Sequence, residues 1–321
     1  MNKFWLLILG SLLLVIAACS NDSASSDESD DSTETTEETS NNSEAEEASG
    51  TKMFTTDSGE EVEVPENPER IVVLHPTYIG ALIEFGYTPE AVPFFVEQDA
   101  VLNDATEGID RIDPANLEEI VNYDPDLIVA TAQDENLSQL QDIAPTVTFD
   151  SNISTFRDNT LLLGELINEK EQAEQWLSDW DASMAEGREK YGELIEGNTL
   201  SIFSSDSRGF ASFGPNYGRG GEILYEGYGF VQPDALAEVT EGQFSVELSP
   251  EDLPQYIGDY TVLAVNGSEP SEIVETAVWK NAEAVQNEHV ITLDMAESRY
   301  NDPISLEYQR GVINEQLDQM K

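Results

Sequence analysis

The stretch of this sequence most suggestive of binding chemistry is FGPNYGRGGEILYEGYGF, residues 213–230, which sets four glycines, an arginine and several aromatics ahead of a predicted helix. A phosphate-binding Walker loop would end in Gly-Lys-Ser or Gly-Lys-Thr, and this stretch has no such ending. A dinucleotide-binding loop would need G-x-G-x-x-G directly after a strand, which the spacing of Gly218, Gly220 and Gly221 does not match. We therefore expect these glycines to form a tight turn into a helix that begins near Glu222.

A second pair of candidates, His75 and Tyr78, follows the buried-strand run IVVL at residues 71–74. Ligands of open α/β sheets bind at the carboxyl ends of the strands, so both side chains are candidates for ligand contact, although a lone histidine is more often structural. The only other histidine, His289, is far away in the chain, and a zinc or manganese site would need several. We expect no resident metal and no cofactor. No G-x-S-x-G nucleophile elbow is present, which disfavours a surface hydrolase.

The N-terminus predicts export. Lys3 precedes an apolar run from Phe4 to Ala17 that is too short for a stable membrane span, so residues 1–18 are predicted to be a signal peptide. The ending IAAC resembles a bacterial lipobox, with Cys19 as the acylated residue; the alternative is an incidental thiol near an ordinary cleavage site. Cys19 is the only cysteine, so no internal disulfide can form.

Residues 19–51 are predicted to be the lipidated cysteine and a disordered tether, because Ser20 to Gly50 contain no aromatic, branched aliphatic or basic residue. An acidic interaction tail is the alternative. The formal net charge of the chain is −51; the tether holds eleven acids and Lys3 is cleaved, which leaves −41 on the folded part. Nucleic acid and anionic membrane are therefore disfavoured as partners.

The remaining sequence predicts an α/β protein with two Rossmann-like lobes. Short apolar strands at 71–74, 127–130 and 146–150 alternate with helices, which favours a parallel sheet. Helices are then predicted at about 156–168 and 170–193, broken at Asn168, before the strand–helix alternation resumes and ends in a helix from about Pro303. The expected organisation is an N-terminal lobe at 52–168, a connecting helix at 169–196 and a C-terminal lobe at 197–321, with the ligand cleft between the lobes.

Several motifs in this order resemble the binding proteins of iron–siderophore ABC importers. They are the lipobox, the acidic tether, GEEVEVPENPERIVVL, NLEEIVNYDPDLIVA, LSPEDLPQY and RYNDPISLEY, and the resemblance extends from about Met53 to the C-terminus. NYGRGG is similar to the N-W-G-R-G-G turn of the hydroxamate-binding branch, with Tyr217 in place of its tryptophan. The resemblance implies a ferric siderophore as the ligand. A hydroxamate or mixed carboxylate–hydroxamate type is favoured, because the more anionic catecholate complexes would need several cationic pocket groups.

The resemblance also implies ligand-binding residues. Arg219 and Tyr217 would face the cleft, where a planar guanidinium with five donors suits hydroxamate oxygens around Fe³⁺; the alternative is that Arg219 only pairs with Glu222 and that Tyr217 is core. Arg299 falls where some relatives place a cleft tryptophan, and either it or Tyr300 is expected to face the cleft. The remaining candidates flank the cleft or lie near a ligand arginine of the family: Arg208, Phe210 and Arg111.

Glu118 in NLEEI and Glu251 in SPEDL match the glutamates that each lobe of this family offers to arginines of the membrane permease; the alternative is that both are ordinary solvated charges. The implied partners are that permease with its cytoplasmic ATPase, a ferric siderophore, and the membrane through the lipid anchor. The protein is then an extracytoplasmic monomer, lipid-anchored to the outer face of the cell membrane, and not an enzyme. A cobalamin, haem or other metal-chelate binder on the same fold is the alternative function.

Overall fold

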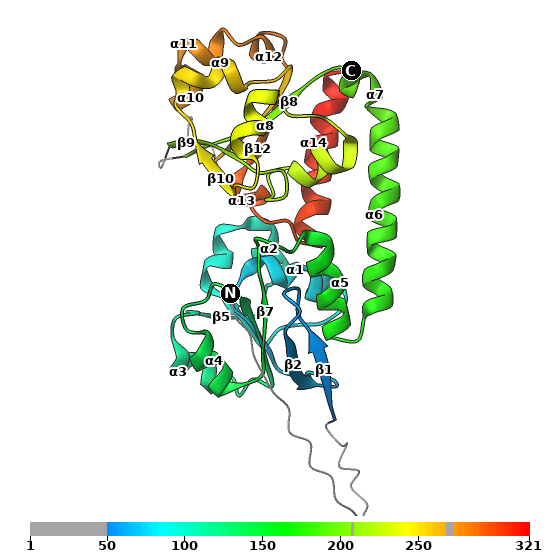
Figure 1. Ribbon diagram of the computed structural model, residues 1–321, viewed down its shortest axis with the longest axis vertical. Helices are drawn as coiled ribbons and strands as arrows, with labels where there is room; N and C mark the ends of the chain where they lie inside the picture. The colour runs from blue at the N-terminus through cyan, green and yellow to red at the C-terminus, as the bar shows by residue number, and fades with distance from the viewer. Residues whose placement is uncertain (1–49, 207–208, 268–271) are drawn as a thin grey trace, which may run out of the picture. The chain divides into compact units, whose positions relative to one another are not determined.

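Two five-stranded sheets flanked by helices make up this protein in its computed structural model, which describes residues 50–206, 209–267 and 272–321 (Figure 1). The predicted signal peptide, Cys19 and all but the end of the tether lie outside the described residues. All the described residues belong to one compact unit. We keep N-lobe for residues 52–168 and C-lobe for residues 197–321 as a proposed division of this unit.

The N-lobe sheet is parallel throughout, in the order β5-β4-β3-β6-β7. Its central strands are unbroken apolar runs because both faces are covered: Ile71 and Val73 pack into one hydrophobic cluster and Val72 into another. The three strands predicted here are confirmed to within one residue at each end. The strands are β3 (Ile71–Val73), β4 (Ala91–Pro93), β5 (Asp110–Ile112), β6 (Leu127–Thr131) and β7 (Thr146–Phe149), after a hairpin of β1 (Thr51–Thr55) and β2 (Glu61–Pro65).

Short helices connect the N-lobe strands. Gly86 follows the end of the first α-helix and has φ of 84°, the left-handed conformation that a helix-ending glycine adopts readily. The helices are η1 (Pro76–Tyr78), α1 (Ile79–Glu84), η2 (Phe94–Gln98), α2 (Ala100–Ala105), α3 (Leu117–Asn122), α4 (Leu137–Ile143) and α5 (Phe156–Leu166).

The C-lobe sheet is mixed, in the order β10-β9-β8-β11-β12. Strands β8, β11 and β12 are parallel, whereas β9 and β10 are antiparallel neighbours at one edge. The simple strand–helix alternation expected from the sequence missed β9, because GFASF is short and carries no turn signal as strong as the glycines that follow it. The strands are β8 (Leu200–Asp206), β9 (Gly209–Phe213), β10 (Ser245–Glu247), β11 (Tyr260–Val265) and β12 (Val290–Asp294).

The helices of the C-lobe include a π-helical segment where the sequence predicted a helix from Glu222, and a final helix that begins at Pro303 as expected. They are η3 (Glu222–Tyr228), α8 (Asp234–Thr240), η4 (Pro250–Asp252), α9 (Leu253–Tyr256), α10 (Glu272–Glu275), α11 (Ala277–Lys280), α12 (Glu283–Gln286), α13 (Met295–Ser298) and α14 (Pro303–Gln319).

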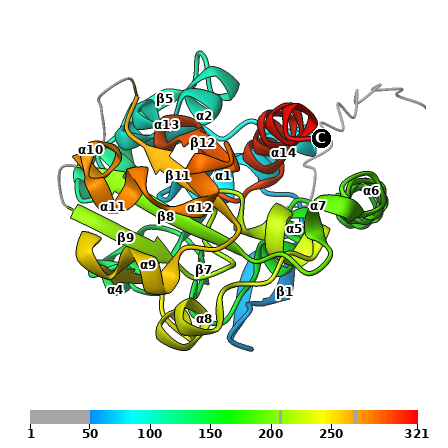
Figure 2. The same cartoon turned by 90° about the horizontal axis from the view of Figure 1, so that it is seen from above.

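A single long helix, α6 (Lys170–Lys190), packs against both lobes, and the short helix α7 (Gly192–Ile195) follows it (Figures 1 and 2). It starts just after Asn168, which breaks the preceding helix with φ of 64°. Ala173 belongs to an N-lobe cluster, whereas Trp180 and Met184 belong to the main C-lobe cluster. One continuous hydrogen-bonded helix is therefore buried against both lobes, which opposes bending between them.

Two further contacts join the lobes: the salt bridges that Arg157 makes, and the packing of the first turn of α14 against α1. Arg157 of α5 pairs with Asp181 of α6 at 2.5 Å and with Glu226 of η3 at 2.7 Å. Asp302 caps α14 by accepting hydrogen bonds from the backbone N–H groups of Ile304 and Ser305. Gly80 of α1 lies so close that an added Cβ would overlap the Asp302 carboxylate. The first turn of α14 is thus seated directly on an N-lobe helix.

We expect Gly80→Ala to lower the free energy of unfolding by about 2 kcal/mol or more, because the new methyl group overlaps a buried capping carboxylate. Gly311→Ala in α14 is the matched control, since an added Cβ there meets nothing within 4 Å. The control should be neutral or stabilising by up to about 1 kcal/mol through helix propensity. Urea titration followed by circular dichroism measures both, and equal stability of the two variants would contradict the close packing of α1 on Asp302.

Candidate functional site

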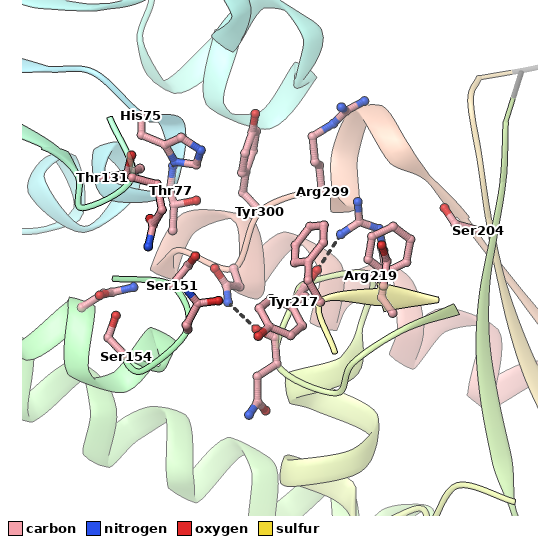
Figure 3. A pocket seen from close by; sticks show the side chains of 18 of the residues that line it. His75, Thr77, Thr131, Ser151, Ser154, Ser204, Tyr217, Arg219, Arg299 and Tyr300 are labelled. Atoms are coloured by element: carbon pink, nitrogen blue, oxygen red, sulfur yellow. Dashed lines mark hydrogen bonds between the residues drawn. The ribbon is translucent and has the colours of Figure 1, made fainter. Parts of the chain in front are cut away.

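A cavity of about 750 Å³ lies at the carboxyl ends of the central strands (Figure 3). His75 follows β3, Thr131 ends β6, and Ser151 follows β7 on its N-lobe wall. Ser204 of β8 and Phe210 of β9 contribute to its C-lobe wall. This is the place and the size expected of a small-ligand site in open α/β sheets.

The glycine turn at residues 214–221 forms part of the C-lobe wall and is fastened to the loop at 298–301. The N–H of Arg219 donates to the carbonyl oxygen of Ser298 at 2.8 Å. An added Cβ on Gly218, which has φ of 75°, would lie 2.6 Å from the carbonyl oxygen of Arg299. Glycine is therefore required at 218 by both conformation and space.

The side chain of Glu222 links this turn to the 298–301 segment through hydrogen bonds. Its buried Oε1 accepts hydrogen bonds from the N–H of Gly218 at 3.0 Å and from the side-chain amide of Asn301 at 2.8 Å. Burial raises the pKa of the Glu222 carboxyl, and these two hydrogen bonds act in the opposite direction. Glu222, which the sequence suggested as an alternative partner for Arg219, thus connects the turn to the 298–301 segment.

Arg219 is held in the cavity wall by an aromatic ring. Its guanidinium lies 3.7 Å from the ring centroid of Phe213, and its Nη1 donates to the carbonyl oxygen of Tyr217 at 2.6 Å. Its φ of 57° is a costly conformation for a residue other than glycine, and such strain often accompanies function. Only 5% of Arg219 is exposed, so its charge acts where water screens it weakly.

Aromatic rings continue this wall beyond Arg219. Phe244 packs edge-on against both Tyr217, with ring centroids 4.9 Å apart, and Phe213, at 5.5 Å. More than half of Phe244 is exposed, at 57%, although it lines the cavity. The sequence analysis missed Phe213 and Phe244 because nothing local distinguishes them from core aromatics.

The N-lobe wall carries hydroxyl, amide and imidazole groups but no ionised side chain among the described lining residues. Burial lowers the pKa of His75 to about 4, so its imidazole is neutral at physiological pH, and its Nδ1 accepts from the N–H of Thr77. Tyr78 is almost fully buried and its hydroxyl donates to the carbonyl oxygen of Phe149. The polar lining residues that the sequence analysis missed on this wall are Thr77, Thr131, Gln133, Ser151, Asn152, Ser154 and Asn159.

Arg299 and Tyr300 both line the cavity, so the choice between them that the sequence left open does not arise. Burial raises the pKa of Tyr300 to about 12, which keeps its phenol neutral. Figure 3 shows both side chains extending from the loop after α13 toward the N-lobe ribbon. Together with Arg219, Arg299 gives the described cavity lining two cations against one acid, Glu247.

One predicted ligand residue, Arg111, does not line this cavity. Arg111 lies elsewhere in the N-lobe, where its guanidinium donates to Asn103 Oδ1 and to the backbone carbonyls of Thr106 and Ile109. These contacts inside its own lobe occupy its donors, so the expectation that Arg111 faces the cleft is not met. Arg208 lies outside the described residues.

Glu118 and Glu251 are both exposed in the first turn of short helices, α3 and η4, one on each lobe. Neither carboxylate makes a hydrogen bond or ion pair within the described parts of the chain. By contrast, Glu119 accepts from the N–H of Asp113 and Asp252 accepts from Gln255.

The part of the chain that the structure describes contains neither a candidate metal-binding cluster nor a candidate membrane-spanning helix. It holds no group of three or more His, Cys, Asp or Glu side chains arranged to bind a metal ion. No helix within residues 50–206, 209–267 and 272–321 is long and apolar enough to cross a membrane.

Comparisons with known proteins identify relatives of this architecture. The chain is 30% identical over 285 residues to the iron(3+)-hydroxamate-binding protein FhuD of Bacillus subtilis, covering 85% of this chain and 89% of that protein. It is similar to FhuD2 of Staphylococcus aureus with bound ferrioxamine B (TM-score 0.76, 30% identity, 79% and 99% of the two chains). It is also similar to a Bacillus subtilis protein described as the binding-protein component of a Fep/Fec-like ferrichrome ABC transporter (TM-score 0.73, 29% identity, 82% and 99%). The periplasmic binding protein family model matches residues 71–296, and the chain belongs to that family.

Proposed function

We propose that this protein is the extracytoplasmic binding protein of an ABC importer and that its cavity binds a ferric hydroxamate siderophore. The observation that carries the proposal is Arg219, buried against Phe213 beside Tyr217 in a cavity of suitable size, in a chain whose relatives include iron-hydroxamate-binding proteins. The protein passes the ferric complex, its cargo, to a membrane permease driven by a cytoplasmic ATPase.

The charge of the cavity favours a hydroxamate complex over a catecholate one. Three hydroxamate anions balance one Fe³⁺, so the iron centre is neutral, whereas three catecholates leave several negative charges. Two arginines and one glutamate in the described lining suit the neutral centre. The charge of −41 on the folded part repels strongly anionic ligands at long range.

In this proposal the arginine donates to ligand oxygens and the aromatic rings cover the ligand's methylene chains. The planar guanidinium of Arg219 is proposed to donate to hydroxamate oxygens. Tyr217, Phe244 and Phe210 supply apolar contact area around them, and the hydroxyl and amide groups of the N-lobe wall hydrogen-bond the ligand's peripheral carbonyls. Arg299, Tyr300, His75 and Tyr78, which also line the cavity, complete the proposed set.

We expect Arg219→Ala to weaken binding of ferrioxamine B by about 1.5–3 kcal/mol, the range for a charge-assisted hydrogen bond. Tyr217→Trp should be tolerated because it keeps an aromatic wall. Isothermal titration calorimetry is the measurement, since Trp176, Trp180 and Trp279 do not line the cavity and would report binding indirectly. Arg310→Gln, which removes a cation paired with Glu307 outside the cavity, is the control. Unchanged affinity in folded Arg219→Ala would remove the central contact of the proposal.

Lipid anchoring through Cys19 is part of the proposal. We expect Cys19→Ser to release the protein from cells into the medium, because the acyl chains would be lost. Fractionation of cells followed by immunoblotting measures this. A variant that stays in the membrane fraction after salt washing would contradict anchoring at Cys19.

Glu118 and Glu251 are proposed to dock onto the permease. We expect Glu118→Ala and Glu251→Ala each to reduce uptake partially, and the double variant to reduce it further, because separated ion pairs set the register of a complex. Ligand affinity should stay unchanged, since neither residue lines the cavity. Uptake of ⁵⁵Fe-ferrioxamine B by cells is the measurement.

A matched control for docking is available on other helices. Glu171 and Glu283 are also exposed acids in the first turns of helices, α6 and α12. Replacing both by alanine removes the same charge and should leave uptake normal. Equal loss of uptake in the two double variants would mean that total charge, and not the two docking glutamates, matters.

A further inference from the structure

A fully buried carboxylate, that of Asp99, lies in the N-lobe at the start of α2. Its Oδ1 accepts from the N–H of Leu102 at 3.0 Å and so caps the helix. Its Oδ2 is buried and has no hydrogen-bond partner among the described residues. Burying a carboxylate oxygen without a partner is costly unless an opposite charge acts on it.

Arg299 of the C-lobe, which lines the ligand cavity, is the cation whose charge affects Asp99. The helix that precedes it, α13, packs against α2. Arg299 makes no hydrogen bond or ion pair within the described residues, and its Nε is buried. Burial raises the pKa of Asp99 to about 6, and the charge of Arg299 acts against this rise. Two buried polar atoms of opposite character, Asp99 Oδ2 and Arg299 Nε, therefore lie without hydrogen-bond partners on neighbouring segments of the two lobes.

We propose that Asp99 sets the charge selectivity of the cavity by partly neutralising the charge of Arg299 across the contact between α2 and α13. The cavity then presents one effective cation, Arg219, in place of two. This inference rests on the proposed function and narrows its substrate class. Ferric trihydroxamates of neutral or positive overall charge are favoured over those that carry a negative group.

Other charged groups surround this pair and do not replace it. Glu297 of α13 raises the pKa of Asp99 slightly. The charge of Asp99 in turn raises the pKa of Asp302 at the start of α14. Tyr300 is neutral. The charges of the two arginines lower its pKa and those of the two aspartates raise it. Glu247, the acid that lines the cavity, is exposed, so water screens its charge.

A ligand series with one iron centre and three overall charges isolates this effect. Ferrioxamine B carries +1 through its terminal ammonium, its N-acetyl derivative is neutral, and an N-acyl derivative ending in a sulfonate carries −1 at every pH used. Calorimetry at pH 7.5 gives the affinity for each complex. The quantity of interest is the ratio of the affinity for the anionic complex to that for the cationic complex.

We expect Asp99→Asn to raise this ratio about three- to tenfold, the effect of one weakly screened unit charge on another. Asparagine is also a good N-cap, so α2 keeps its capping acceptor. Asp104→Asn is the matched control: it removes the same charge from an exposed position of α2 and should leave the ratio unchanged. Arg299→Gln should lower the ratio, and the effect of Asp99→Asn should be smaller in the double variant, because its action through Arg299 is lost.

The pH dependence provides a second readout. In the wild-type protein the ratio should rise as the pH falls from 7.5 to 5.5, because Asp99 gains its proton near pH 6 and no longer opposes Arg299. Asp302, whose pKa burial raises to about 7, titrates in the same range, and the charge of Asp99 raises that pKa further, so the comparison is repeated in an Asp302→Asn background to remove its contribution. The part of the rise that is due to Asp99 should be absent from Asp99→Asn.

An unchanged ratio in folded Asp99→Asn, or an identical pH profile in the two proteins, overturns the role of Asp99 while the proposed function stands. Should Asp99→Asn not fold, Arg299→Gln alone decides, because an unchanged ratio there also overturns the inference. Failure of the wild-type protein to bind any of the three complexes overturns the proposed function instead.

Discussion

The hydrogen-bonded contact between the turn at 214–221 and the loop at 298–301 is the constraint on which the binding site depends. Glu222 joins the two segments from beneath, and Gly218 lets their backbones touch. This contact fixes Arg219 in a strained conformation over Phe213, and it places Arg299 and Tyr300 at the cavity. The strain at Arg219 is maintained because the neighbouring hydrogen bonds leave the turn no alternative conformation.

The same loop links the site to the rest of the fold. Asp302 follows it directly and seats the first turn of α14 on Gly80 of the N-lobe, while α6 packs against both lobes on another side. A bend between the lobes would have to disrupt buried packing at two places. Ligand entry by a large hinge motion is therefore disfavoured, and smaller adjustments of exposed groups such as Phe244 are favoured.

The sequence predicted the elements whose signal is local. The strand Leu127–Thr131 is an unbroken apolar run because it is buried on both faces, and α6 shows its buried face in the spacing of Ala173, Leu177 and Trp180. Strand β9 was missed because its place in the sheet depends on pairing with β8 and β10 and not on its own composition. The fastening role of Glu222 was equally invisible, since it requires knowing that Asn301 lies beside it.

Residues of the cavity were predictable only where a motif marked them. Arg219 and Tyr217 stand in a glycine turn with a recognisable pattern, and the resemblance drew attention to Arg299 and Tyr300. Arg111 was chosen because it lies near the place of a ligand arginine in the family. Position along the sequence does not determine which acceptors a guanidinium contacts, and those of Arg111 lie within its own lobe. Phe244 lines the cavity only because β10 pairs with β9, a long-range contact.

Charge gives the site its character against a strongly acidic background. The folded part carries a net charge of −41, so most of its surface potential is negative. Arg219 and Arg299 differ from this background because they lie in the cavity wall. Arg219 is shielded by Phe213, and Arg299 is opposed by the buried carboxylate of Asp99. In the proposed function, long-range repulsion disfavours anionic complexes before contact, and the proposed neutralisation of Arg299 by Asp99 disfavours them at contact. Both effects act in the same direction, so the acidity of the surface and the electrostatics of the pocket select the same class of ligand.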